Sequence, residues 1–215
     1  MLHLYVDSAD RDQAGPLLST GLFRGLTTNP LLLRRSGLVE RDLPELYGWA
    51  TGLGAQEVFL QTWGATYDHL VATGRRLRAI GPAVVVKAPA TRQGCAAAAT
   101  LAAEGVPVLL TAVYAAPQAL LAAAAGATYL APYVGRMADA GRPAIEEVTA
   151  MQRLLDATGG PTRVLAASLR TTADVVTLAG AGVRHFALAP AVAERLFGDP
   201  LTEAATAEFE AAAAG

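Results

Sequence analysis

Short apolar runs alternate with longer segments of helical character along the chain. The apolar runs recur about every 27 residues, and Val, Leu, Ala and aromatic side chains dominate them. They predict strands at Leu2–Val6, Phe23–Thr27, Glu57–Gln61, Ala83–Lys87, Pro107–Ala112, Thr128–Ala131, Arg163–Ala167 and His185–Ala189. Strands that alternate with helices are typical of repeated βα units around a parallel sheet. The pattern therefore predicts one (β/α)8 barrel domain over residues 1–215.

The segments between the strands contain residues that cap and end helices. They predict helices from Thr91 to Gly105, from Pro117 to Gly126, and from Thr171 or Thr172 to Gly180–Gly182. Residues 201–215, after Pro200, predict an additional C-terminal helix. A doubly wound open sheet would show the same alternation, but no Gly-x-Gly-x-x-Gly turn follows the first strand. We therefore favour the barrel.

Composition supports a buried core and gives no sign of a charged partner. Hydrophobic residues make up 53% of the chain and charged residues 17%, while the net charge is −2. A chain with this balance is not expected to bind nucleic acid or a membrane surface. The stretch between Glu104 and Arg136 carries no charge, but prolines interrupt it, and we interpret it as barrel core.

The N-terminal segment and the cysteine content indicate a cytoplasmic protein. Asp7, Asp10, Arg11 and Asp12 interrupt any apolar run of the kind found in signal peptides. Cys95 is the single cysteine, so no disulfide can form within the chain, which suits a reducing compartment.

Polar side chains stand at or just beyond the C-terminal ends of seven of the eight predicted strands. They are Asp7, Thr27, Thr28, Asn29, Gln61, Lys87, Thr111, Tyr133 and Ser168. Each of them alone would be explained as a residue that ends a strand. In a barrel, however, all these ends lie on the face that hosts active sites. The pattern therefore predicts a polar site at that face.

Lys87 is the only lysine in the chain, beside 16 arginines. A lysine after the apolar run Val84–Val86 offers an amine that can lose its proton, which arginine cannot do. Burial among apolar side chains would lower the pKa of this amine, as a Schiff-base nucleophile requires. The alternative is a lysine that reaches the rim without taking part in chemistry, and the local sequence leaves both interpretations open.

Five blocks of sequence resemble the transaldolase family, in the order found there. They are Leu4–Asp7 (LYVD), Thr27–Pro30 (TTNP), Val86–Thr91 (VKAPAT) with Gly94, Ala131–Arg136 (APYVGR) and Ala166–Arg170 (AASLR). The resemblance runs from Asp7 to about Pro190 and is greatest to the short members, the fructose-6-phosphate aldolase and small transaldolase branch. It implies a barrel in which Lys87 forms an imine with a donor ketone.

The resemblance also assigns expected roles to other positions. Asp7 matches the acidic residue near the lysine, and Asn29, beside Thr28, matches the active-site asparagine. The phosphate of the acceptor is expected at Arg136, Ser168 and Arg170, where arginine's planar fork and a hydroxyl suit it. No cofactor is implied. No metal is expected either, because His3, His69 and His185 are scattered. His185 begins a strand and is expected at the face opposite the site.

Three positions distinguish aldolases from transaldolases within this branch. Transaldolases usually carry glutamate where this chain has Gln61 and phenylalanine where it has Tyr133. They also place an asparagine two residues before Thr111, where this chain has Leu109. Gln61, Thr111 and Tyr133 could together hold a water, with the Tyr133 hydroxyl moving the proton. These positions favour an aldolase that releases dihydroxyacetone.

The predicted function is a class I aldolase that cleaves or forms fructose 6-phosphate or a related sugar. The alternatives are a transaldolase, which transfers the three-carbon unit, and a non-catalytic barrel that binds sugar phosphates. Leu31 replaces the family's serine and Trp63 follows Gln61, so the preferred sugar stays open. Family resemblance implies a homo-oligomer, a pentamer or decamer, and residues 201–215 would either dock on a neighbouring subunit or cover their own barrel.

Overall fold

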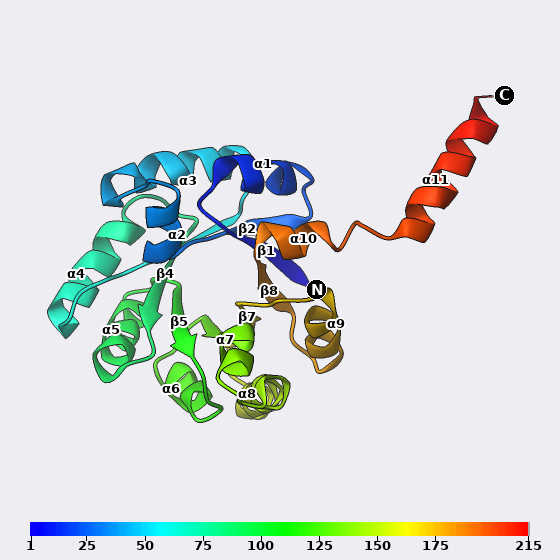
Figure 1. The fold of residues 1–215 in the computed structure, drawn as a ribbon. Coiled ribbons are helices and arrows are strands. Elements are labelled where there is room, and N and C mark those ends of the chain that lie inside the picture. The colour runs from blue at the N-terminus through cyan, green and yellow to red at the C-terminus, as the bar shows by residue number, and fades with distance from the viewer. Residues whose placement is uncertain (215) are drawn as a thin grey trace.

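The eight predicted strands form a closed barrel. In a computed structural model that describes residues 1–214, the strands are parallel and neighbour one another in chain order (Figure 1). They are β1 (His3–Asp7), β2 (Phe23–Thr27), β3 (Glu57–Gln61), β4 (Val84–Pro89), β5 (Val108–Val113), β6 (Tyr129–Pro132), β7 (Arg163–Ala166) and β8 (His185–Leu188). Each boundary lies within two residues of the predicted one, and the barrel predicted from the alternation is confirmed.

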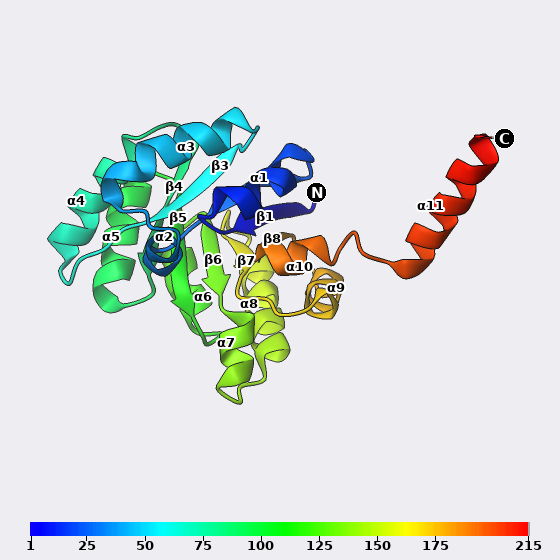
Figure 2. The same cartoon turned by 45° about the horizontal axis from the view of Figure 1, so that its top comes forward.

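Helices surround the barrel and connect its strands (Figure 2). They are α1 (Arg11–Ser19), α2 (Pro30–Arg35), the 3-10 turn η1 (Glu40–Asp42), α3 (Leu43–Gly52), α4 (Tyr67–Arg78), α5 (Arg92–Ala103), α6 (Gln118–Ala124), α7 (Val134–Asp139), α8 (Ala144–Thr158), α9 (Thr172–Gly180), α10 (Pro190–Glu194) and α11 (Pro200–Ala213). The predicted helices are confirmed, and Thr171 rather than Thr172 caps α9. The uncharged stretch forms β5, α6 and β6, and no helix within residues 1–214 is long and apolar enough to cross a membrane.

Strand alternation separates the barrel interior from the layer beneath the helices. A cluster made only of strand and strand-end residues fills the interior, and it contains Tyr5, Phe59, Val85, Leu109, Tyr129, Ala131, Leu165, Ala167 and Ala187. The residues between them along the strands, such as Val86 and Leu110, pack with the helices in a second, larger cluster. Because side chains alternate along a strand, Lys87, two residues beyond Val85, has the inward orientation.

A polar network closes the N-terminal end of the barrel. The Glu57 carboxylate accepts hydrogen bonds from the hydroxyls of Tyr5 and Tyr129, both at 2.8 Å, and from Arg24 Nε at 2.7 Å. Burial raises the pKa of both tyrosines, that of Tyr129 to about 12, so these hydroxyls remain donors. The half-buried carboxylate therefore has its acceptor sites filled, as a charge in such a place requires.

His185 belongs to the same end of the barrel. Its Nδ1 lies 3.2 Å from the Tyr5 hydroxyl, and its ring stacks on His3 with centroids 4.9 Å apart. Burial, followed by the charges of His3 and Arg163, lowers the pKa of His185 to about 4, against the opposing effect of Glu57. The prediction that His185 lies opposite the polar strand ends is confirmed, because it begins β8.

Helix α11 extends away from the barrel in both views (Figures 1 and 2). None of its described side chains is buried, and the exposed fractions of Leu201 and Phe209 are 82% and 70%. In this structure α11 therefore does not cover its own barrel, which was one of the two arrangements expected for the C-terminal segment. Gly215 lies outside the described residues.

We predict that the free energy of unfolding falls as the pH drops from 6.5 to about 4. His185 takes up a proton near 6.5 when unfolded but only near 4 when folded, so the unfolded chain binds more protons in this window. The shift corresponds to about 3 kcal/mol. Urea unfolding at about pH 7 and about pH 4.5 measures the effect.

The variant His185→Gln removes the titrating imidazole and should lose less stability on acidification than the wild type. His69→Gln, which changes an exposed histidine on α4, is the matched control and should follow the wild type. Equal acid sensitivity of the wild type and His185→Gln would contradict the prediction.

Candidate active site

A cavity of about 300 Å³ lies at the C-terminal ends of the strands. Seven of the ten residues that the sequence singled out line it, namely Asp7, Asn29, Lys87, Tyr133, Arg136, Ser168 and Arg170. Thr28, Gln61 and Thr111 do not line it, although each adjoins a residue that does. Strands and loops far apart in the chain thus supply one site, as expected for this face of a barrel.

The Lys87 amine lies at the base of this cavity. The residue is 4% exposed, and its Nζ donates to the carbonyl oxygen of Thr28 at 2.7 Å. Burial lowers the pKa of Lys87 from its ordinary value of 10.5, while the charge of Asp7 raises it in part. Both neutral and protonated amines can donate to a carbonyl, so this contact does not require the charged form. The lowered pKa makes it easier for the amine to lose its proton.

Thr27 connects Lys87 with Asp7. The Thr27 hydroxyl donates to Asp7 Oδ1 at 2.7 Å, and it lies 3.4 Å from Lys87 Nζ, from which it can accept. β1 and β2 pair Asp7 directly with Thr27, which fixes this contact. Among residues 1–214 there is no direct ion pair between Lys87 and Asp7, so the hydroxyl mediates their interaction. The sequence placed Thr27 at a strand end but not among the site residues.

Thr28 and Asn29 shape the wall next to the amine. The Thr28 side chain faces β3, where its hydroxyl donates to the Phe59 carbonyl at 3.0 Å, and only its own carbonyl reaches Lys87. Asn29 caps α2, because its side-chain oxygen accepts from the N–H groups of Leu31 and Leu32. Both residues therefore order the loop between β2 and α2 around the cavity.

Thr111 and Tyr133 form a hydroxyl pair on the other side of Lys87. Their oxygens lie 2.8 Å apart, and burial raises the pKa of Tyr133. Ala112, next to Thr111, has a left-handed backbone (φ 58°), and the pairing of β5 with β6 shifts at this point. A non-glycine residue in this conformation costs about 1 kcal/mol, a cost found mostly at functional sites.

Gln61 lies beside Lys87 in the register of β3 and β4. Its side chain is half-buried, and within residues 1–214 it makes no hydrogen bond to Thr111 or Tyr133. The structure therefore brings two of the three expected water-holding groups into contact. The third, Gln61, pairs with Lys87 only through the register of the two strands.

The arginines and serine expected at the phosphate lie together at the rim. Arg136 lies over the Tyr133 ring, 4.9 Å from its centroid, and Arg170 is paired with Asp139 at 2.7 Å. Ser168 has a left-handed backbone (φ 57°), and its carbonyl accepts from the N–H of Gly135 at 2.8 Å. A Cβ at Gly135 would lie 2.3 Å from that carbonyl and 2.6 Å from Arg170 Nε. Glycine here lets α7 approach the loop after β7.

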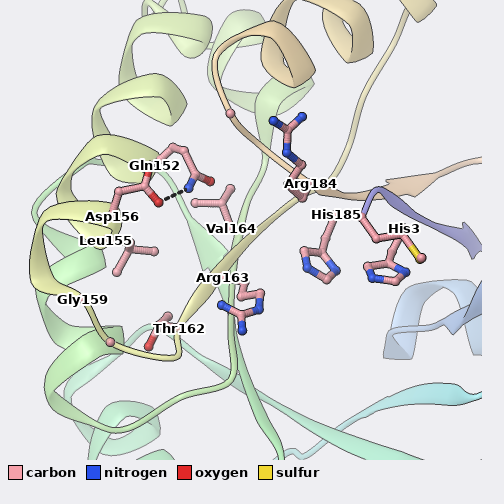
Figure 3. A pocket seen from close by; sticks show the side chains of 13 residues that line it. His3, Gln152, Leu155, Asp156, Gly159, Thr162, Arg163, Val164, Arg184 and His185 are labelled. Atoms are coloured by element: carbon pink, nitrogen blue, oxygen red, sulfur yellow. Dashed lines mark hydrogen bonds between the residues drawn. The ribbon is translucent and has the colours of Figure 1, made fainter.

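A second, larger cavity of about 570 Å³ lies at the opposite end of the barrel (Figure 3). His3 and His185 lie side by side there, while Arg184 points away from them and donates to the Ala179 carbonyl at the end of α9 at 3.3 Å. Arg163 also lines this cavity, but no buried amine does in the described chain. The smaller cavity is therefore the candidate for imine chemistry. Among residues 1–214, no group of three or more His, Cys, Asp or Glu side chains could hold a metal ion.

We predict that modification of Lys87 by an amine reagent has a pH midpoint below 10.5, because burial lowers its pKa. Asp7→Asn should move the midpoint further down, since the carboxylate stabilises the ammonium. Mass spectrometry of the peptide that contains Lys87 measures the extent of labelling, and the same chain in denaturant is the control. A midpoint at or above 10.5, or an upward shift in Asp7→Asn, would overturn this.

Solved structures similar to this chain share its barrel. Thiamine phosphate pyrophosphorylase from Pyrococcus furiosus superposes with a TM-score of 0.61 at 18% identity, covering 89% of this chain and 87% of that one. Inosine 5′ monophosphate dehydrogenase from Legionella pneumophila gives a TM-score of 0.64 at 12% identity, covering 88% and 58%. At these identities the likeness shows the fold alone.

Sequence relatives are more informative. A probable transaldolase of Phenylobacterium zucineum is 37% identical over 208 residues, which cover 97% of this chain and 94% of the relative. Probable transaldolases of Caulobacter vibrioides and Desulforudis audaxviator are each 36% identical, covering 97% of this chain and 94% and 95% of theirs. The sequence profile described as Transaldolase/Fructose-6-phosphate aldolase matches residues 4–214. The chain therefore belongs to the transaldolase/fructose-6-phosphate aldolase family.

Proposed function

We propose that this protein is a class I aldolase of that family, which cleaves or forms fructose 6-phosphate or a related sugar. The products of cleavage would be dihydroxyacetone and an aldehyde such as glyceraldehyde 3-phosphate. The observation that carries the proposal is the single lysine of the chain, buried at the base of a cavity with three arginines on its walls. No other amine in the described chain is buried.

The reaction starts when the neutral Lys87 amine attacks the C2 carbonyl of the sugar. Loss of water gives an iminium ion, and cleavage of the C3–C4 bond sends its electron pair towards the iminium nitrogen. The C4 hydroxyl loses its proton and leaves as the aldehyde carbonyl. Protonation of the remaining enamine and addition of water release dihydroxyacetone and restore the amine.

Thr27 and Asp7 lie where protons move during imine formation. The path from Lys87 Nζ through the Thr27 hydroxyl to Asp7 Oδ1 has steps of 3.4 and 2.7 Å. A carboxylate at the end of such a path can accept the proton that the attacking amine releases. Thr27 therefore acts as a positioning residue that keeps Asp7 available without a tight ion pair to the amine.

Tyr133 and Thr111 serve the proton transfers at the sugar carbons. Because burial raises the pKa of Tyr133, its hydroxyl is protonated before the reaction and acts through the Thr111 hydroxyl and an adjoining water. Gln61, which pairs with Lys87 in the strand register, would hold that water against the imine. The same water would hydrolyse the imine after C–C cleavage.

The phosphate of the sugar is bound at the rim, by Arg136, Ser168 and Arg170, with Thr28 and Asn29 ordering the opposite wall. Arginine pairs with phosphate through two parallel hydrogen bonds, so Arg170 would exchange Asp139 for the ligand. The exposed Asp139 carboxylate would return to solvent, which makes the exchange inexpensive.

A transaldolase is the second candidate, since the relatives at 36–37% identity are named probable transaldolases. Such an enzyme keeps the three-carbon unit on the lysine until an aldose phosphate arrives. The Thr111–Tyr133 hydroxyl pair favours the aldolase, because it provides a proton path that a phenylalanine would lack. A non-catalytic binding barrel would have no use for a buried amine.

We predict sustained release of both dihydroxyacetone and glyceraldehyde 3-phosphate from fructose 6-phosphate alone. Tyr133→Phe should lower this turnover about a hundredfold, as loss of a general acid–base does, while keeping the ring beneath Arg136. Borohydride should still trap dihydroxyacetone on Lys87 in this variant. Thr111→Val, which removes the partner of the tyrosine, is the matched variant and should cost about tenfold.

Other outcomes would assign other functions. One stoichiometric burst of glyceraldehyde 3-phosphate, renewed only by erythrose 4-phosphate, would identify a transaldolase. No release, together with no borohydride adduct on Lys87 from dihydroxyacetone, would leave a sugar-phosphate-binding barrel.

We also propose that α11 docks on a second copy of this chain. Leu201, Ala205 and Phe209 recur every four residues and form an apolar stripe along one side of this helix. A helix of this length without packing partners is marginal in water, so the stripe needs a surface to cover it. The proposal agrees with the homo-oligomer that the family resemblance implied.

We predict that the double variant Leu201→Glu/Phe209→Glu has a lower mass in light scattering than the wild type. Two carboxylates in the stripe would lose their hydration upon docking, which strongly disfavours burial. The control Ala207→Glu/Ala211→Glu places the same two charges on the opposite side of the helix and should leave the mass unchanged. A wild-type mass for the double variant would show that α11 does not mediate assembly.

A further inference from the structure

One side of α2 forms part of the cavity wall. Leu31, Leu32 and Arg35 line the cavity. Leu31 and Leu32 lie four and three residues before Arg35, so the three side chains share one face of the helix. Asn29 at the N-cap fixes the start of this helix. Arg34 and Arg35 are both exposed, but Arg34 lines none of the cavities described above. α2 therefore presents one arginine, and not the other, to the cavity.

Arg35 differs from the other two arginines of the cavity in its contacts. Arg136 lies over the Tyr133 ring and Arg170 is paired with Asp139. Arg35 has no ion pair and no side-chain hydrogen bond within the described chain. It also lines a neighbouring cavity of about 350 Å³ together with Asp10 and Asp12, of which Asp10 caps α1. Its five donors thus remain free for a ligand.

The charges of the cavity favour an anion. Arg35, Arg136 and Arg170 are cationic, and Asp7 is the one carboxylate among the described residues that line it. The Asp7 carboxylate accepts a hydrogen bond from the Thr27 hydroxyl. It ends β1, whereas the three arginines follow other strands. Guanidinium groups bind phosphate through paired, charge-assisted hydrogen bonds. A phosphate group near the rim would therefore have three guanidinium groups on the surrounding walls.

We propose that Arg35 is a specificity-determining residue that contacts the phosphate of the aldehyde acceptor. The inference rests on the proposed function, because it takes the reaction of that site as given. Arg35 approaches from α2, whereas Arg136 and Arg170 belong to the segments after β6 and β7. It therefore clamps the phosphate from a second direction and favours phosphorylated over unphosphorylated aldehydes.

The test compares two acceptors, glyceraldehyde 3-phosphate and glyceraldehyde, with dihydroxyacetone as donor. Arg35→Gln should raise the KM for the phosphorylated aldehyde about tenfold, the effect of one charged contact. The KM for glyceraldehyde and the kcat for both acceptors should change less than about twofold. A contact to the phosphate stabilises the bound substrate and the transition state equally, so it affects KM and leaves kcat unchanged. Arg34→Gln removes the same charge one residue away and should change each constant less than about twofold. Arg35→Lys should restore part of the preference.

Calorimetric titration with inorganic phosphate separates this proposal from the proposed function. Weaker phosphate binding in Arg35→Gln than in Arg34→Gln supports the contact even if no aldol reaction is found. If the aldol reaction is present but both variants bind phosphate and both acceptors alike, Arg35 has no such role and the aldolase proposal stands. An equal rise in KM for both acceptors would likewise overturn the role.

Discussion

The hydrogen bond from Lys87 Nζ to the Thr28 carbonyl organises the site around it. The amine is buried, so its charged form is costly, yet its donors still need an acceptor. A carbonyl accepts equally from the neutral amine, whereas a carboxylate in direct contact would hold the proton on the nitrogen. Thr27 keeps Asp7 one hydroxyl away from the amine. The ends of β1 and β2 and the lysine of β4 thus place a hydroxyl between the carboxylate and the amine. For this reason Lys87 has no direct ion pair within the described chain.

The buried charged groups at the two ends of the barrel have different kinds of partner. At the N-terminal end, Glu57 is satisfied by two tyrosine hydroxyls and Arg24, and His185 stays neutral. At the C-terminal end, the Lys87 amine contacts only neutral groups, and Ala112 and Ser168 at the same end have left-handed backbones. The buried charge at the N-terminal end therefore has an ionic partner, whereas the amine at the C-terminal end has only neutral groups in direct contact.

Strand positions could be predicted because each strand is a short apolar run between helix caps. The boundaries differ by a residue or two, since the strands continue while they have a neighbour to pair with, as β4 does through Pro89. Polar strand ends predicted which face carries the site, because parallel strands in a barrel all end there. Thr111 and Tyr133 were expected at one water only through the family resemblance, and their direct hydroxyl contact could not be predicted from the residue pattern. The contact lies beside the register shift at Ala112, which no residue type signals. Arg35 was missed for a similar reason, because α2 is too short for its periodicity to be recognised.

The rim arginines show how an open cavity can stay ordered before a ligand arrives. Asp139 holds Arg170, and the Tyr133 ring holds Arg136. Both interactions are weak because the two arginines are exposed. A phosphate offers each guanidinium a bidentate contact that is stronger than the one it replaces. The resting contacts therefore reduce the conformational entropy lost on binding without competing strongly with the ligand. They also connect the proposed phosphate site with the proposed proton path, since the ring beneath Arg136 belongs to the same Tyr133 whose hydroxyl contacts Thr111.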